Sequence, residues 1–408
     1  MAAETQPDRL SALPNDILRT ILIAADLDHR TAAQTSLLSR RWRDLWKSTI
    51  RQLRFETPPR HLATLRNKLR FIQFVETLLA AREAGSELTL ISITANDALD
   101  PKYADVFDRI CAYGSAHGVR TFQLSLRAPT REIVGSFPPD FVRLCMSLHN
   151  LDLSLVSFDL DDLRRRASHF PCLAALRLFR CELYAPPALD YEPFASLPNL
   201  KKVELIDSVF STKNAVTVSG EQLEEITIVF SDEPHLLVTS ICAPKATKLT
   251  LAGVSLSRFA SVKLPSLECL DIDVWVRRPW DTTVFARLRR ALYVPWEERV
   301  DADVRFLNTF HKFGRAMFVK LHPSTIERLV TMVPGLLEGA EGSPFKRMRS
   351  LELCGPEPGN REFISLVNYF FMHQCLRGAH LSKRTYVSQE GGDTSRVVIV
   401  LREDGNDD

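Results

Sequence analysis

The chain has 408 residues, 45% of them hydrophobic and 25% charged, with a formal net charge of +2. A chain of this length can bury a large core or form two domains. Basic and acidic residues are interleaved and the basic runs are short, so the sequence predicts no nucleic-acid partner. No apolar run approaches the roughly 18 residues that span a bilayer, and the first residues lack the apolar stretch of a secretory signal, so we expect no membrane partner and a location in the cytoplasm, the nucleus or both.

Residues 10–46 predict two or three short helices with more apolar surface than so short a segment can bury. In the first part, leucine and isoleucine recur at steps of three and four residues, which places them on one side of a helix. Pro14 stands where a first helical turn tolerates proline. In the second part Leu37, Leu38, Trp42 and Leu45 recur at similar steps. Such a segment packs either on the rest of its own chain or on a partner.

The same segment closely resembles the F-box, in the form common in plants. One departure is the run from Ile23 to Asp26, where relatives more often carry a bulky residue. The resemblance implies docking on the Skp-type adaptor of a cullin–RING ubiquitin ligase, by helices laid into a groove. It implies that Trp42 either anchors this interface or locks the helices together. The implied adaptor-binding residues are Leu10, Leu13, Pro14, Ile17, Leu18, Ile21, Leu22, Leu38 and Trp42. Ser36, Ser39, Arg41 and Trp46 complete the matching positions.

After this segment the sequence predicts a linker and then the first regular elements. Residues 51–60 combine a short strand with a Thr-Pro-Pro break, which is typical of a hinge. Residues 61–84 have the apolar spacing of a helix, and Leu88 to Thr94 alternates as a strand does. A further helix is expected to start at Asp100-Pro101 and to end at Gly118.

Between residues 119 and 275 one pattern returns: an apolar residue, two others, an apolar residue, one other and an apolar residue. Its period mostly falls in the range of leucine-rich repeats, and the segment resembles an irregular leucine-rich repeat. Each unit buries its leucines against its neighbours, which predicts a solenoid with one continuous core. The copies begin at Val119, Leu148, Leu173, Leu200, Leu223, Ala246 and Leu267, and a last copy at Met348 stands alone.

Because side chains alternate along a strand, the residues between the buried leucines are expected to point outward from the sheet. The column through Phe179, Ile206, Val229 and Ala252 is apolar in its middle. An exposed apolar strip needs a cover, which is either a bound protein segment or the chain's own loops and C-terminal segment. The candidate client-binding residues are Arg177, Phe179, Glu204, Ile206, Thr227, Val229, Thr250 and Ala252.

Residues 276–345 break the period and predict two helices, at about 301–313 and 323–337. They either continue the solenoid with longer helices or form an insertion. A helix at 361–377 and a hairpin with strands at 384–388 and 396–401 follow, with a turn at 390–393 and an acidic tail. This last part resembles the C-terminal domain of plant F-box/leucine-rich-repeat proteins.

The residues that most often carry chemistry follow no recognised pattern. The eight cysteines and ten histidines lack the spacing of metal ligands, and no phosphate-binding loop, dinucleotide-binding turn or nucleophile elbow occurs. The sequence therefore predicts no metal, no cofactor and no catalytic residue. An enzyme with an active site assembled from distant residues in 276–408 is the alternative.

These features predict an α/β chain with an all-helical F-box at 8–50, a linker at 51–60 and a curved leucine-rich-repeat solenoid at 61–355, irregular at 276–345, whose concave face is a parallel sheet. A helix, a hairpin and the tail occupy 356–408. The resemblance implies a non-catalytic, substrate-recognition subunit of a Skp–cullin–F-box ubiquitin ligase, which contacts cullin and RING subunits through the adaptor and holds a client protein for ubiquitination. An adaptor-bound scaffold without ubiquitination and a small-molecule receptor are the alternatives.

Overall fold

The structure is a computed structural model. It describes residues 13–25, 27, 29–38, 41–42, 45–82, 87–96, 103–127, 144–159, 164–165, 167–184, 191–211, 216–231, 238–274, 296–336, 345–355, 360–375, 380–387 and 395–402. The chain divides into two compact units, Met1–Tyr184 and Ala185–Asp408, and each is described by itself.

The first unit begins with short helical segments: α1 (Asn15–Ala24), α2 (His29–Gln34), the 3-10 turn η1 (Thr35–Leu37) and α3 (Leu45–Thr49). Pro14 caps the beginning of α1, as its fixed backbone angle favours. A small core holds α1 and α3 together, formed by Leu18, Leu22, Trp42 and Leu45 with Leu13 and Leu27 packed partly against it. Leu10 lies outside the described residues.

The sheet of the first unit is parallel. Its neighbouring strands are β1 (Gln52–Glu56), β2 (Leu90–Ala95), β3 (Thr121–Leu126), β4 (Asn150–Ser154) and β6 (Ala175–Phe179). Strand β1 lies in the segment expected as a linker, and it is the edge strand of this sheet. The expected Thr-Pro-Pro break directly follows it.

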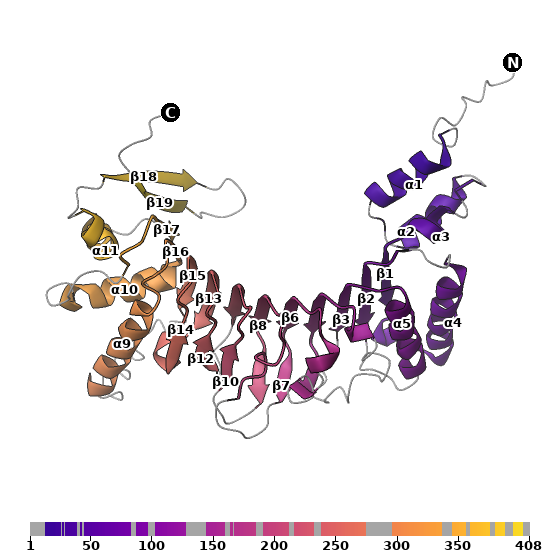
Figure 1. Cartoon of the computed structure of the whole chain (residues 1–408), viewed down its shortest axis with the longest axis horizontal. Coiled ribbons are helices and arrows are strands. Elements are labelled where there is room, and N and C mark those ends of the chain that lie inside the picture. Colours follow the sequence, from indigo (N-terminus) through magenta and orange to yellow (C-terminus); the bar gives the residue numbers. More distant parts are fainter. Residues whose placement is uncertain are drawn as a thin grey trace, which may run out of the picture. The chain divides into compact units, whose positions relative to one another are not determined.

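Two longer helices connect the first strands of this unit. Helix α4 (Leu65–Ala81) follows β1 and the short turn η2 (Arg60–Leu62), and α5 (Ala104–Ala116) follows β2. They lie side by side (Figure 1), and the rings of Phe71 and Tyr103 meet edge to face. The expected helix start at Asp100-Pro101 lies outside the described residues, while its expected end at Gly118 follows α5 directly. A short parallel pair, β5 (Ser157–Asp159) with β7 (Glu182–Tyr184), and the turn η4 (Ala167–His169) complete the unit.

The second unit carries a longer parallel sheet. Its neighbours are β8 (Lys202–Ile206), β11 (Glu225–Val229), β13 (Lys248–Val254), β15 (Cys269–Val274), β16 (Phe318–Leu321) and β17 (Ser350–Cys354). A second small parallel sheet pairs β10 (Val216–Ser219), β12 (Val238–Cys242) and β14 (Ser261–Lys263). Along the chain, strand β9 (Val209–Ser211) follows β8, and the turn η5 (Leu256–Arg258) follows β13.

Every predicted repeat copy forms a strand of one of these sheets, and burial alternates along it as expected. In β11, for example, Ile226 and Ile228 are buried while Thr227 and Val229 are only half-buried. The mixed α/β fold with its large parallel sheet is therefore consistent with a repeat solenoid.

The copy at Met348 was expected to stand alone, and this is wrong. Strand β17 pairs with β16, which itself pairs with β15. The missed copy is Ala316, Val319 and Leu321, and all three are buried. Helix α9 (Trp296–His311) precedes β16, and α10 (Pro323–Leu336) connects β16 to β17. The structure therefore favours a sheet that continues with longer helices.

The C-terminal elements follow the prediction. Helix α11 (Asn360–Cys375) precedes an antiparallel hairpin of β18 (His380–Val387) and β19 (Ser395–Arg402). Strand β19 pairs antiparallel with β17, so this hairpin extends the sheet at its edge. The expected turn at 390–393 and the acidic tail lie outside the described residues. The rings of Phe310 on α9, Phe370 on α11 and Phe345 pack together.

Candidate interaction surfaces

Helix α1 carries apolar side chains on two sides. Leu18 and Leu22 are buried, whereas Ile17 and Ile21 are 47% and 38% exposed. Pro14 is also exposed and precedes Ile17 by three residues. Steps of three and four residues place side chains on one side of a helix, so these three residues line an exposed apolar edge of α1.

A second group of exposed apolar side chains lies at the end of η1. Leu37 is 87% exposed and Leu38 is 59% exposed. The Nε atom of Arg41 donates a hydrogen bond to Oδ1 of Asn15 at 2.9 Å, which ties Arg41 to the first residue of α1. Soluble proteins seldom gather exposed apolar residues without a partner to cover them. We call Pro14, Ile17, Ile21, Leu37 and Leu38 the exposed helical set.

The predicted adaptor-binding residues fall into two groups in the structure. Pro14, Ile17, Ile21 and Leu38 are exposed, whereas Leu18, Leu22 and Trp42 are buried among the helices. Leu13 is partly buried against the same core. Leu37 was not among the predicted residues, although its place beside Leu38 in a Leu-Leu pair was a signal for it.

Trp42 lies in the helical core. It is 3% exposed and packs with Leu18, Leu22 and Leu45, and α1 and α3 contact each other there. Its Nε1 atom has no hydrogen-bond partner in the part of the chain that the structure describes. The placement favours the second of the two predicted roles, in which Trp42 locks the helices together.

On the sheet of the first unit, two predicted client-binding residues interact with their neighbours. Arg177 pairs with Asp152 on the adjacent strand, with 3.2 Å between Nη1 and Oδ2. Phe179 lies beneath two guanidinium groups, those of Arg177 and Arg180, at 5.8 and 5.3 Å from its ring centre. Such contacts attract a cation to the face of an aromatic ring, so they partly cover Phe179.

On the sheet of the second unit, the other predicted client-binding residues form two rows across neighbouring strands. Ile206, Val229 and Ala252 lie opposite one another, and so do Glu204, Thr227 and Thr250. All six are half-buried, since they stand on the face of the strands that points away from the core. We call the first of these rows the apolar row.

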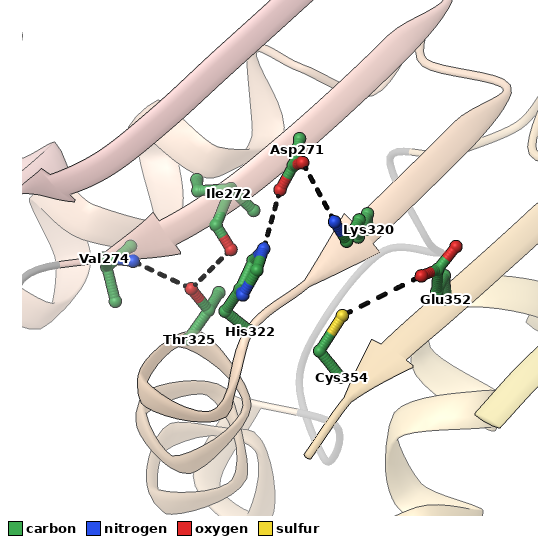
Figure 2. Close-up of polar contacts among 8 residues, drawn as sticks. All are labelled: Asp271, Ile272, Val274, Lys320, His322, Thr325, Glu352 and Cys354. Carbon is green, nitrogen blue, oxygen red and sulfur yellow. Dashed lines mark hydrogen bonds and ion pairs between the residues drawn. The ribbon is translucent and has the colours of Figure 1, made fainter. Parts of the chain in front are cut away.

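A polar cluster that the sequence did not predict as a site continues this face on β15, β16 and β17 (Figure 2). Nε2 of His322 donates to Oδ1 of Asp271 at 2.9 Å, and Nζ of Lys320 approaches Oδ2 at 3.3 Å. Glu352 lies opposite Lys320 on the next strand and accepts a long contact of 3.9 Å from the thiol of Cys354. The side chains of Asp271, Lys320 and His322 are 31%, 36% and 31% exposed, so the cluster is open to solvent.

The contacts in this cluster keep the carboxylate of Asp271 and the ammonium group of Lys320 charged. Burial tends to raise the pKa of Asp271, but the hydrogen bond from His322 and the charge of Lys320 outweigh it and lower the pKa below its ordinary value. Burial tends to lower the pKa of Lys320, but the charge of Asp271, its hydrogen bond to Lys320 and the charge of Glu352 raise that pKa above the ordinary value. The pair is therefore ionised at neutral pH.

A buried threonine fixes the helix that follows this cluster. Oγ1 of Thr325 accepts a hydrogen bond from the backbone N–H of Val274 at 2.9 Å and donates to the carbonyl of Ile272 at 3.0 Å (Figure 2). The backbone N–H of His322 also donates to the carbonyl of Ile272, at 3.1 Å. The beginning of α10 is thereby tied to the end of β15, and this holds His322 beside Asp271.

Two kinds of site have no candidate in the described part of the chain. No group of three or more histidine, cysteine, aspartate or glutamate side chains there is placed to hold a metal ion. None of the described helices is both long enough and apolar enough to cross a membrane.

The chain combines parallel strands that repeat one buried apolar pattern with helices that expose apolar side chains. This mixed α/β architecture is consistent with the class of repeat solenoids. No protein-family model matches it. Among curated proteins it is similar to one named F-box/LRR-repeat protein, from Arabidopsis thaliana, with 27% identity over 284 residues. The similar region is 65% of this chain and 43% of the relative, so the chain spans less than half the length of the relative that it matches. This distant similarity supports an F-box/leucine-rich-repeat family.

Proposed function

We propose that the chain is the substrate-recognition subunit of a Skp–cullin–F-box ubiquitin ligase, and that the exposed helical set docks on the Skp-type adaptor. The observation that carries this proposal is the exposure of Ile17, Ile21, Leu37 and Leu38 in the segment whose sequence resembles the F-box. Burying an apolar side chain of this size contributes roughly 1.5–3 kcal/mol. That figure is for a side chain that goes from fully exposed to buried, and these four side chains are 38–87% exposed in the free chain, so each contributes the part that matches its exposed area.

The remaining predicted adaptor-binding residues differ in how deeply they are buried, and this decides the role we propose for each. Leu18, Leu22 and Trp42 hold α1 and α3 in place in the free chain, so they act on docking by shaping the surface. Leu13 stands at the border between the core and the exposed edge, and Leu10 stays a predicted contact. Cullin and RING subunits reach the chain through the adaptor in this proposal.

The client protein binds the sheet in this proposal. The predicted residues on β6, β8, β11 and β13 point away from the buried leucines, and strand residues of this kind are available to a partner. The lysine attack and the thioester chemistry belong to other subunits, and this chain contributes proximity alone. It is therefore a non-catalytic subunit.

The adaptor interface can be tested by co-purification of the full chain with a recombinant Skp-type adaptor. Replacing Ile17 and Leu38 together by aspartate places two charges among apolar contacts, and we expect at least about a 100-fold loss of affinity. The matched control is Ile364→Asp on α11, a residue that is 57% exposed and belongs to the other unit. Circular dichroism of each variant checks that the helices remain folded.

Equal recovery of adaptor with the double variant and the wild type would contradict the docking surface, and no recovery with either would contradict the F-box assignment. Adaptor binding without cullin-dependent turnover of bound proteins would instead reduce the function to that of an adaptor-bound scaffold.

A further inference from the structure

In the second unit, the segments that lead into β13, β15, β16 and β17 stack along one edge of the sheet, because these strands are parallel. Backbone hydrogen bonds join them in order. The N–H of Glu268 donates to the carbonyl of Thr247 at 2.9 Å, and the N–H of Met317 donates to the carbonyl of Glu268 at 2.8 Å. The N–H of Arg349 then donates to the carbonyl of Met317 at 2.8 Å. We call these segments the basic edge, and they comprise residues 243–248, 263–268, 312–317 and 345–349.

Positive charge gathers on the basic edge. Seven exposed lysine and arginine residues lie there, and none of them pairs with a carboxylate in the part of the chain that the structure describes. Arg315, Lys312 and Lys245 donate to neutral oxygens, two carbonyls and a glutamine amide, at 3.0, 3.4 and 2.7 Å, so their charges stay uncompensated. The seven residues are Lys245, Lys248, Lys263, Lys312, Arg315, Lys346 and Arg347.

Acids do little to offset this charge. Glu268 is the one acidic residue within the four segments of the basic edge. Glu225 lies opposite Lys248 on the neighbouring strand, but it is held by Lys202, with 3.3 Å between Nζ and Oε2. The excess of positive charge attracts an anionic partner.

The form of the basic edge favours an acidic peptide over a nucleic acid. Phe318, the first residue of β16, is 45% exposed, and it is the one exposed aromatic ring beside the described segments of this edge. Single-stranded nucleic acid is bound on a series of such rings, on which successive bases stack. Glu268 lies among the cations, where the charge that a phosphate backbone carries at every step would be repelled. A peptide can place an uncharged residue there.

We propose that the basic edge binds an acidic segment of the client, with aspartate or glutamate side chains against its lysines and arginines and an apolar side chain against Phe318. This inference rests on the proposed function, because it names the charge of the client that the sheet holds. Neighbouring strands are about 4.8 Å apart, so the edge spans roughly 14 Å, the length of about four extended residues. Side chains alternate along an extended segment, so an acid at every second position faces the edge.

The first test is selection of short random peptides displayed on phage against the immobilised full chain. Peptides that also bind the Phe318→Ser variant are removed, because this neutral change alters the surface beside the cations and leaves every charge in place. The peptides that remain bind the basic edge. We expect them to be enriched in aspartate and glutamate on either side of an apolar residue.

The charge is then tested with a synthetic peptide of the enriched sequence. We expect Lys346→Gln with Arg347→Gln, or amides in place of the acids of the peptide, to weaken binding roughly five- to tenfold. The matched control is Arg66→Gln with Arg70→Gln, which removes the same charge from two exposed residues of α4 in the other unit and should leave the affinity unchanged.

The chain has two acidic segments of its own that could compete for this edge, at 338–341 and 403–408, and both lie outside the described residues. The selection is therefore repeated on a variant in which the acids of both segments are replaced by their amides. Edge-specific peptides obtained with this variant alone would assign the basic edge to the chain's own acids and overturn the inference.

Other outcomes would also overturn the inference. These are a selection that yields no edge-specific peptide, edge-specific peptides poor in acids, and unchanged affinity in the Lys346/Arg347 variant. Tighter binding of an RNA oligonucleotide or a phosphatidylserine vesicle than of the acidic peptide would do the same. The proposed function is judged separately: loss of peptide binding in a Val229→Gln variant reports on the apolar row, and co-purification reports on the adaptor.

Discussion

At the scale of single residues, the end of the repeat strands imposes a backbone conformation that few side chains tolerate. The residue that follows the last outward position is left-handed at or just after the end of several strands, at Leu155, Arg180, Asp207, Gly253 and Gly355. This conformation costs a non-glycine residue roughly 1–2 kcal/mol. Asp207 offsets the cost with hydrogen bonds from the backbone N–H and the hydroxyl of Ser231, at 2.6 and 3.0 Å.

Gly253 is the residue of this group for which glycine is strictly required. Its φ is +65°, and a Cβ atom there would lie 1.9 Å from the carbonyl oxygen of Phe230. We expect Gly253→Ala to lower the free energy of unfolding by at least about 2 kcal/mol, measured as a shift of the urea midpoint. Gly118→Ala is the control, because its φ is +61° but nothing lies within 4 Å of the added atom. Equal losses in the two variants would show that the contact with Phe230 is unimportant.

At the scale of elements, strands were easier to predict than the surfaces they carry. The apolar triplet fixes the inward side of each strand, since side chains alternate, and it placed Ile206, Val229 and Ala252 correctly on the outward side. It missed β16 because the copy begins with Ala316, which is too small to stand out among leucines, and because α9 intervenes. With β16 missed, the pairing of His322 with Asp271, 51 residues earlier, could not be predicted.

Helical periodicity has a related limit. It assigned the apolar residues of α1 to a helix, but Ile17 and Leu18 are neighbours of equal hydrophobicity and only packing against Trp42 and Leu45 decides which is buried. The sequence therefore identified the segment that carries the candidate surface, while the structure separates the exposed residues from the core.

The link between β15 and α10 is an element-scale device that can be tested. Thr325→Val keeps the shape of the side chain and removes its hydroxyl, so the N–H of Val274 loses its acceptor in a buried place. We expect a loss of about 1–3 kcal/mol in the free energy of unfolding, with Thr325→Ser as the control that keeps the hydroxyl. The free energy of unfolding is measured by urea denaturation, and hydrogen exchange at the N–H of Val274 is measured separately in the native protein. If the Thr325→Val variant were as stable as the Thr325→Ser variant, the hydroxyl of Thr325 would not be the group that ties α10 to β15.

At the scale of the whole molecule, a chain that holds apolar side chains in water has a predictable solution behaviour. Exposed Ile17, Ile21, Leu37 and Leu38 can be covered by another copy when no partner is present, because the hydrophobic effect does not discriminate between surfaces. We therefore expect the isolated chain to self-associate as its concentration rises, and sedimentation velocity to show this.

The double variant Ile17→Asp with Leu38→Asp should shift the chain toward monomer. Saturating Skp-type adaptor should do the same to the wild type, because both changes make the same apolar surface unavailable to a second copy of the chain. Ile364→Asp should leave self-association unchanged. A wild-type chain that stays monomeric at all concentrations, or whose self-association the adaptor leaves intact, would mean that the exposed helical set is not the surface that drives association.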